Sequence, residues 1–388
     1  MHAGESAWRD DGLERRCLRG LLSLSRRAQG RGECVSDKEG LQVQLSCPVP
    51  VGTRDRIVLG HGGGGLLTNR LIEDVFLRAF DNPWLGARHD GAVVPFAGTR
   101  LAMSTDSYVV NPMFFPGGDI GKLALCGTVN DVAMCGARPL YVSVGLILEE
   151  GTPVETIRRV VASMQAVARA AGVHVVTGDT KVVERGRGDQ IYINTTGVGI
   201  VEGDREVGPS QVREGDAVLI SGDVGRHGIA VMAAREGIGF DTTIESDCAP
   251  LAAMVQDLFA AGIDVRCLRD CTRGGVASAL VEIAQVAGVE IEIREDALVV
   301  EPQVQGACEL LGFDPLYVAN EGCLIAFVAP DDVARALDVM RRDPAGRRAS
   351  ELGRVMCTAD RSEVRLRSTI GTSRIIDLLN GEQLPRIC

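Results

Sequence analysis

The sequence predicts a two-domain protein of mixed α/β (α+β) class. Its 388 residues exceed the size at which a single hydrophobic core usually divides. Segments with the period of a strand alternate with segments of helical period along the chain. Two such blocks are joined by the polar, turn-rich stretch GPSQVREGD. We therefore expect an N-terminal domain at 53–208 and a C-terminal domain at 209–365.

The composition is that of a soluble globular protein. Hydrophobic residues make up 45% of the chain, and a formal net charge of -11 leaves no basic surface for nucleic acid. No apolar run approaches the roughly 18 residues of a membrane span, and the first residues lack the apolar core of a secretory signal. The 12 cysteines are scattered, without a CxxC pair, so we expect a cytoplasmic protein with mostly reduced thiols.

The elements of the first block follow from periodicity. Residues 1–52, rich in Arg, Gly, Ser and Glu, show no sustained apolar period and are expected to be a poorly ordered extension. The run RIVLGHGGGG predicts a glycine loop that enters a helix over LLTNRLIEDVFLRAF. Strands are predicted at TRLAMSTD, PLYVSVGLILEE, VHVVTGDTKVV and QIYINTTGVG. A helix is predicted over 154–171, with an apolar face of Val154, Ile157, Val161 and Met164.

The second block repeats this style. AVLIS is predicted to be a strand, followed by a glycine turn, SGDVGRHG, and a helix. LAAMVQDLFAAG predicts a helix, GVEIEIRED a half-buried strand and GCLIAFVAP a fully buried one. One face of the LAAMVQDLFAAG helix carries Leu251, Met254, Val255 and Leu258. Residues 366–388 are predicted to be a flexible C-terminal tail. Its last segment, EQLPRIC, is expected to move between buried and exposed positions, because it contains Pro385 and few apolar anchors.

Four polar segments end apolar runs or adjoin glycine, where loops often carry functional side chains. Their polar residues are Asp106, the pair Asn130 and Asp131, Asp179, and Asp270. Each aspartate taken singly is more typical of a cap or a turn. Their number on similar loops favours Mg²⁺, which joins carboxylates to substrate phosphates.

Three further features have two interpretations each. The glycines Gly62, Gly63, Gly64 and Gly65 suit either a phosphate loop or a flexible hinge, and they form neither a Walker A nor a dinucleotide pattern. In an extended strand Lys181 would point the same way as Asp179, either as a group that contacts a nucleotide or moves a proton, or as half of a surface ion pair. Glu321 is either a solvated strand end or a base.

His227 has no second histidine near it in the sequence. The five histidines of the chain are dispersed, which is not the pattern of a metal site. We therefore expect His227 to take part in a turn or in hydrogen bonding.

Six segments, in this order, resemble the HypE family of hydrogenase maturation factors from about residue 57 to the last residue. They are LGHGGGGLLTNRLI, STDSYVVNPMFFPGGDIGKLALCGTVNDVAMCGARPLYVS, TGDTKVV, DCTRGGVA, ANEGC and GEQLPRIC. Relatives in the wider aminoimidazole ribonucleotide synthetase and selenophosphate synthetase (PurM-like) superfamily share the aspartate loops but lack the last motif. The resemblance implies a two-domain PurM-like fold, a nucleotide between the domains and a homodimer formed by the N-terminal domains.

The resemblance also implies an activity. The enzyme would use ATP to dehydrate an S-carbamoyl group on Cys388 to S-cyanocysteine, which supplies the cyanide ligand for the iron centre of a [NiFe]-hydrogenase. ATP has a clear chemical purpose. The amide oxygen is a poor leaving group, and its phosphorylation by ATP allows it to leave as phosphate. The implied cofactors are ATP and Mg²⁺. The implied partners are the carbamoyltransferase HypF as carbamoyl donor and the HypC–HypD complex as cyanide acceptor.

Residue roles carry over from the family by motif. The residues implied to hold Mg²⁺ are Asp106, Asp131 and Asp270. Those implied to line the nucleotide site are Asn130, Asp179 and Thr180, with Gly62 to Gly65 as a mobile cover. Lys181 and Glu321 are implied to withdraw protons from the thiocarboxamide nitrogen, and Cys388 is the implied site of the reaction.

Two other hypotheses stay open at this point. A superfamily relative that phosphorylates a small molecule would keep its turnover after Cys388→Ala. A non-catalytic carrier that only presents a cysteine adduct would not bind ATP, although it would have no need of Asp106, Asp131 or Asp179.

Overall fold

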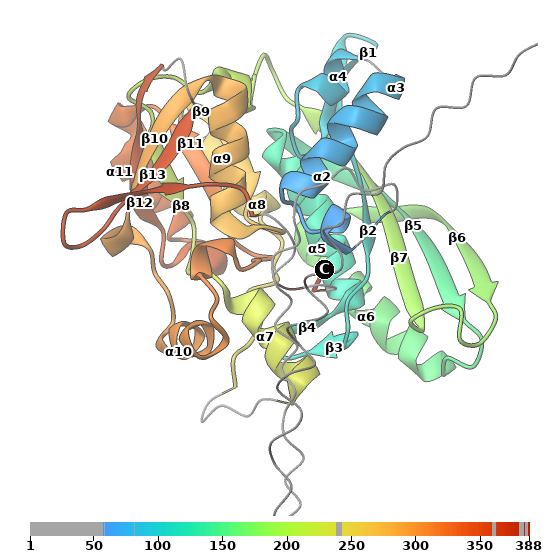
Figure 1. Cartoon of the computed structure of the whole chain (residues 1–388). Coiled ribbons are helices and arrows are strands. Elements are labelled where there is room, and N and C mark those ends of the chain that lie inside the picture. The colour runs from blue at the N-terminus through green and yellow to red at the C-terminus, as the bar shows by residue number, and fades with distance from the viewer. Residues whose placement is uncertain are drawn as a thin grey trace, which may run out of the picture. The chain divides into compact units, whose positions relative to one another are not determined.

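The computed structural model describes residues 57, 59–80, 82–237, 243–358, 362–379, 384 and 387–388, so the extension predicted at 1–52 lies outside the described residues. Residues Pro48–Cys388 form one compact unit. Within it lie two main sheets, and helix α5 (Ile120–Met134) lies between them (Figure 1). Helix α5 is buried along almost its whole length, as is typical of a helix with apolar residues all round. No helix in the described ranges is long and apolar enough to cross a membrane.

The first sheet has the strand order β1-β2-β7-β5-β6. Its strands are β1 (Ala92–Phe96), β2 (Thr99–Tyr108), β5 (Ala137–Glu149), β6 (His174–Val183) and β7 (Ile191–Val201). β5 and β6 are parallel and the other pairs are antiparallel. Helix α5 packs on this sheet, and α6 (Val154–Ala171) packs on α5. All four strands predicted for this block are confirmed.

The helix predicted over 154–171 is confirmed as α6, but part of its predicted apolar face is wrong. Val154 and Val161 are 65% and 46% exposed. The buried residues of the helix are Val160, Met164, Val167 and Ala168. The contact with α5 explains the difference: Gly121 has no side chain there, and a Cβ on it would lie 2.5 Å from the Val160 carbonyl oxygen. The backbones therefore approach most closely at Val160, which sets the buried face.

The second sheet has the strand order β14-β13-β10-β12-β8-β11-β9. Its strands are β8 (Ala217–Ile220), β9 (Val265–Asp270), β10 (Val289–Arg294), β11 (Leu324–Val328), β12 (Ser350–Thr358), β13 (Glu363–Arg367) and β14 (Ser373–Ile376). A small ribbon pairs β3 (Phe114–Phe115) with β4 (Gly118–Asp119). The predicted strands AVLIS, GVEIEIRED and GCLIAFVAP are confirmed as β8, β10 and β11.

Helices cover both faces of the second sheet, which explains why β8 and β11 are apolar throughout. The helices of this half are α7 (Arg226–Glu236), α8 (Ala252–Ala260), α9 (Gly275–Ala287), α10 (Pro302–Leu311) and α11 (Val333–Met340). Helix α9 shares one core with alternate residues of β8 and β11, and α8 and α11 share the other. The face predicted for the LAAMVQDLFAAG helix is buried in α8, as expected.

Short helical segments complete the fold. Three short α-helices precede the first sheet in the chain: α2 (Leu66–Leu71), α3 (Arg78–Phe80) and α4 (Pro83–Gly86). Single turns are η1 (Leu59–Gly62), η3 (Pro209–Gln211), η4 (Glu295–Ala297), η5 (Pro315–Tyr317), η6 (Pro330–Asp332) and η7 (Pro344–Gly346). The π-helical segment η2 (Ile72–Leu77) joins α2 to α3, so the predicted glycine loop does lead into a helical segment.

The segment predicted as a tail, 366–388, first completes β13 and then forms β14. After β14 the Leu379 carbonyl accepts a hydrogen bond from the Leu66 N–H, at 3.2 Å. Leu384 and Ile387 are buried, at 6% and 5% exposure. Two apolar side chains therefore anchor this segment. The sequence did not indicate this anchoring, because the two residues are isolated and show no apolar period. The last residue, Cys388, shares a pocket with residues of α5, and the C-terminus is marked beside that helix in Figure 1.

Candidate active site

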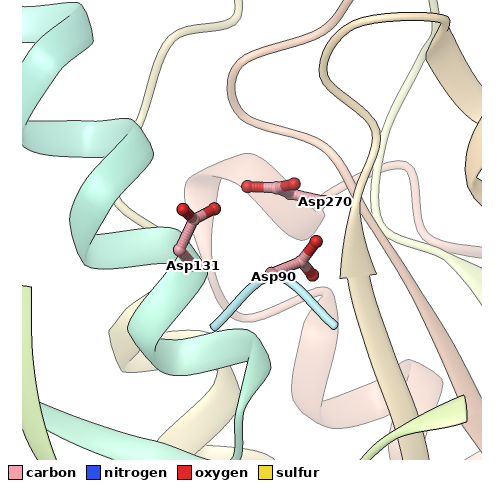
Figure 2. A group of neighbouring side chains, drawn as sticks. All are labelled: Asp90, Asp131 and Asp270. Carbon is pink, nitrogen blue, oxygen red and sulfur yellow. The ribbon is translucent and has the colours of Figure 1, made fainter. Parts of the chain in front are cut away.

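Three aspartates come together where α5 meets the second sheet. Asp131 lies on α5, Asp270 ends β9, and Asp90 precedes β1. One oxygen of each carboxylate lies within 4.8 Å of the others, and the three side chains point toward one another in Figure 2. Clustered carboxylate oxygens are the ligands that Mg²⁺ and Ca²⁺ prefer.

Neighbouring groups orient the cluster but leave part of its charge unmatched. The Ser104 hydroxyl donates to Asp131 Oδ2 at 2.6 Å, and Arg269 Nε lies 2.7 Å from Asp90 Oδ1. Asp90 Oδ2 and Asp270 Oδ2 are buried and have no hydrogen-bond partner among the residues that the structure describes. Burying such oxygens is costly unless something compensates their charge. The residues therefore fit a divalent cation.

The pKa values of two of these carboxyls reflect the same crowding. Burial, followed by the charges of Asp270, Asp90 and Asp106, raises the pKa of Asp131 well above its usual range. Burial and then Asp90 raise the pKa of Asp270 in the same way. A bound cation would favour the ionised forms and reverse both shifts.

Cys388 occupies a pocket beside this cluster. The pocket is lined by Cys388 and by five charged residues of separate elements, Asp106, Asp131, Asp270, Arg273 and Glu321. Its volume is about 20 Å³, room for about one water molecule. Three of the predicted aspartates thus share a pocket with Cys388, although Asp106 lies outside the three-carboxylate cluster.

Glu321 is the buried carboxyl of this pocket, at 4% exposure. Its own N–H donates to Asp247 Oδ1 at 3.1 Å, and the Gly322 N–H donates to Asp247 Oδ2 at 3.0 Å. Burial, followed by the Cys248 and Asp270 charges, raises the pKa of Glu321 well above its usual range. A carboxyl with a raised pKa is a stronger base than a solvated one, so Glu321 suits proton removal.

The glycine loop contacts the wall of the Cys388 pocket. Arg273 Nη1 donates to the Gly62 carbonyl at 3.1 Å. Gly64 has a φ of +72°, and a Cβ there would lie 3.0 Å from the Arg273 carbonyl oxygen. Negative charge at Cys388 is the largest cause of the raised pKa of Arg273. The glycine loop thus contacts Arg273, whose positively charged side chain faces the end of the chain.

A second cavity, of about 530 Å³, lies on the first sheet and shares Ser107 and Tyr108 with the Cys388 pocket. Asp179 and Lys181 of β6 line this cavity, and Thr180 lies between them in the strand. Lys181 Nζ is 2.9 Å from Asp179 Oδ2. The predicted common direction of these two side chains is confirmed, and they form an ion pair at the edge of a cavity.

Asn130 makes contacts between elements rather than with either cavity. Its Oδ1 accepts from the Leu251 N–H at 2.7 Å and its Nδ2 donates to the Ala249 carbonyl at 3.1 Å. Its exposure is 1%. Both ends of the amide thus tie α5 to the segment that precedes α8.

We expect Asn130→Ala to lower the free energy of unfolding by about 1–3 kcal/mol, because it leaves the buried Leu251 N–H and the part-buried Ala249 carbonyl without their partner. Urea unfolding measures this change. Arg158→Ala is the control, since its ion pair with Glu155 is exposed and should matter by at most about 0.5 kcal/mol. Unchanged stability with weakened ATP binding would instead assign Asn130 to the nucleotide.

Two residues of this site were not predicted from the sequence. Asp90 stands before a glycine at the start of a strand, in RHDGAVV, which is the same signal that drew attention to the other aspartates. Arg273 belongs to the DCTRGG segment, in which only Asp270 was singled out. In both cases a charged residue directly precedes a glycine, and this pattern is the local signal that indicates them.

Comparison with known proteins identifies the family. Residues 88–201 match the AIR synthase related protein family, N-terminal domain, and residues 213–364 match its C-terminal domain. The carbamoyl dehydratase HypE of Cupriavidus necator is 51% identical over 334 residues, which cover 86% of this chain and 95% of that protein. The chain belongs to the carbamoyl dehydratase HypE family. It is therefore an enzyme of the dehydratase type.

Solved HypE structures agree with the fold. A HypE in complex with ATP has a TM-score of 0.73 and 47% identity, and the match covers 86% of this chain and 100% of that chain. A HypE–HypF complex gives a TM-score of 0.76 and 47% identity, and covers 80% of this chain and 99% of that chain. The predicted resemblance to HypE and the two-part PurM-like α/β fold are confirmed. The predicted domain limits and residue roles stay predictions.

Proposed function

We propose that this HypE-family chain uses ATP to dehydrate an S-carbamoyl group on its own Cys388 to S-cyanocysteine, for the cyanide ligand of a [NiFe]-hydrogenase iron centre. One observation carries the proposal: Cys388 lies in a pocket with Asp131, Asp270 and Glu321. A thiol that carries the reacting group would thus lie beside carboxylates that suit a cation and a carboxyl that suits a base.

The proposed chemistry balances without any further reactant. The carbamoyl oxygen attacks the γ-phosphorus of ATP and ADP leaves. The nitrogen then loses its two protons, the carbon–nitrogen triple bond forms, and the carbamoyl oxygen departs with phosphate. The products are thiocyanate, ADP and phosphate, so the net change at the cysteine is the loss of one water.

Mg²⁺ would supply positive charge to the phosphates during this transfer. We propose that Asp90, Asp131 and Asp270 hold it, because two of their buried oxygens have no partner within the described residues. Asp106, which the family motif implied as a ligand, lines the adjoining pocket and would reach a cation bound to the phosphates from there.

We propose the cavity of about 530 Å³ as the nucleotide site, since ligand pockets commonly enclose about 300–1,000 Å³. It adjoins the Cys388 pocket through Ser107 and Tyr108, which suits a triphosphate directed toward the carboxylates. Asp179, Thr180 and Lys181 would contact the nucleotide from β6. The glycine loop, which rests on Arg273, would cover the phosphates.

We propose Glu321 as a base for the thiocarboxamide nitrogen, because it lines the Cys388 pocket and has a raised pKa. Lys181 lies on the other cavity, where its charge also suits the nucleotide. The roles of Lys181 in charge neutralisation and in proton removal can be separated by comparing Lys181→Arg with Lys181→Met.

The proposed partners follow from the family. HypF is the proposed carbamoyl donor, supported by the HypE–HypF complex of a relative. The HypC–HypD complex is the proposed acceptor, and the proposed location is the cytoplasm.

A homodimer through the first sheet would cover the exposed apolar side chains of β6, Val175, Val176 and Val182.

Intact mass spectrometry tests the proposed function. After carbamoylation of the full chain, addition of ATP and Mg²⁺ should remove one water from the modified residue, because dehydration occurs on the protein itself. Peptide 383–388, released by cleavage after glutamate, locates the change. A carbamoyl adduct that persists on a folded protein with ATP bound would contradict the proposal.

A further inference from the structure

His227 contacts the end of the chain from a fully buried position in the first turn of α7. Its Nε2 lies 2.7 Å from the Ile387 carbonyl oxygen, and its Nδ1 lies 2.8 Å from the Ser246 hydroxyl. Ile387 directly precedes Cys388. The proposed chemistry gives His227 no task, yet the side chain holds the backbone one residue away from the reacting thiol.

Only one assignment of donors and acceptors gives His227, Ser246 and the Ile387 carbonyl a hydrogen bond each. A carbonyl oxygen only accepts, so His227 Nε2 carries a proton and donates to Ile387. Burial lowers the pKa of His227 to about 4, so the neutral ring accepts at Nδ1 near pH 7. The Ser246 hydroxyl therefore donates to Nδ1, and it accepts from the Cys248 N–H at 3.0 Å. Ser246 thus fixes the tautomer that holds the tail.

We propose that His227, oriented by Ser246, is a positioning residue that docks the end of the chain through the Ile387 carbonyl and so holds Cys388 beside Glu321 during dehydration. This inference rests on the proposed function, in which Cys388 carries the reacting group.

The elements that hold His227 are also those that hold Glu321. At the start of α7 the Gly225 N–H donates to Asn320 Oδ1 at 2.7 Å, and the Gly228 N–H donates to the Ala319 carbonyl at 3.0 Å. Ser246 is followed by Asp247, which accepts from the Glu321 N–H. Two short stretches of backbone therefore connect the docking contact at His227 to the proposed base Glu321. One runs from α7 to residues 319–320, and the other from Ser246 to Asp247.

Apolar contacts alone would not set the position of Cys388. Leu384 and Ile387 are buried, and Gly228 allows a close approach, since a Cβ there would lie 3.0 Å from Leu384 Cδ1. Apolar burial favours docking but has no direction, whereas a hydrogen bond fixes the position of one atom against another. Undocking would also leave a buried His227 N–H without its partner, which favours the docked state.

Two substitutions at His227 separate these effects in the full chain. His227→Asn places an amide near Nδ1, so it keeps a partner for Ser246 but loses the donor to Ile387. His227→Gln reaches the position of Nε2 and restores that donor. The rate of alkylation of Cys388 by iodoacetamide, read on peptide 383–388, reports how often the end of the chain undocks.

We expect alkylation about tenfold faster in His227→Asn than in wild type, the equivalent of one net hydrogen bond, and near the wild-type rate in His227→Gln. Single-turnover dehydration should fall at least several-fold in His227→Asn and recover in His227→Gln. Equal alkylation rates in the two variants would overturn the docking contact, and equal dehydration rates would overturn its role in positioning. If His227→Asn does not fold, Ser246→Ala carries the test, and unchanged alkylation in that variant would overturn the inference.

The same experiment separates this inference from the proposed function. Wild-type protein that never dehydrates its adduct would contradict the function, whatever the alkylation rates. Wild-type dehydration combined with identical behaviour of both variants would contradict only the role of His227.

Discussion

Asp270→Asn is expected to lower the single-turnover rate of ATP-dependent dehydration by about 10²–10³-fold, the usual loss when one charge-stabilising group is removed from an active site. The substitution keeps the size of the side chain but removes one negative charge from the three-carboxylate cluster. Carbamoylation of Cys388 should proceed as in wild type, because the proposed role of the cluster is to hold a cation at the phosphates of ATP. Rapid quenching followed by intact mass measurement gives both rates.

The control for this change is Asp257→Asn, which makes the same substitution at an exposed position of α8 and should leave the rate unchanged. Stability provides a second readout. Mg²⁺ should stabilise the wild type against unfolding and should stabilise Asp270→Asn much less. Dehydration that is lost while Mg²⁺ still stabilises the variant fully would contradict a metal-binding role for Asp270.

The raised pKa values give the sign of a related pH effect in metal-free protein. The folded chain keeps protons on Asp131 and Asp270 at a pH where the unfolded chain has released them. These groups therefore favour the folded state below their unfolded pKa, and their contribution is lost as the pH rises through the folded values. Asp270→Asn should weaken this pH dependence, because one of the two groups no longer titrates.

Local sequence patterns predicted most of the elements and few of their tertiary contacts. The strands β5 and β7 and the helix α8 were predicted by period, because one layer of packing decides which of their residues are apolar. The strand β11 was predicted by its unbroken apolar run, because helices cover both of its faces. The buried face of α6 was partly wrong, because the close approach at Gly121 selects Val160 over Val161. Such a selection depends on a second helix and leaves no trace in the periodicity of the first.

The candidate site shows the same division. Asp131 and Asp270 were singled out by their segments, but their meeting with Asp90 requires α5 to pack against β9. The role of His227 was expected only as hydrogen bonding, since nothing local indicates that its partner is Ile387, 160 residues later. Chemistry that depends on residue type was therefore predictable, and chemistry that depends on long-range docking was not.

Cys388→Ser is expected to abolish formation of both the carbamoyl and the cyano adduct, because it replaces the one proposed nucleophile and changes a single atom. Other cysteines offer poor substitutes. Of the described cysteines, all but Cys357 and Cys388 are buried, and burial raises the pKa of Cys308, for example, to about 11, which disfavours the reactive thiolate. ATP binding should stay within about threefold of wild type, because Cys388→Ser removes no contact to the nucleotide.

Cys357→Ser is the matched control for this experiment, since Cys357 is the other described cysteine that solvent reaches. It should form and dehydrate the adduct at the wild-type rate. Peptide mapping covers Cys17, Cys34 and Cys47 as well, which lie outside the described residues. A stoichiometric adduct on Cys388→Ser, at any of these positions, would mean that the reacting group is carried elsewhere. Complete loss of the adduct with retained ATP binding would instead identify Cys388 as the residue that carries the reacting group. Removal of a structural residue would also disturb the ATP site around it.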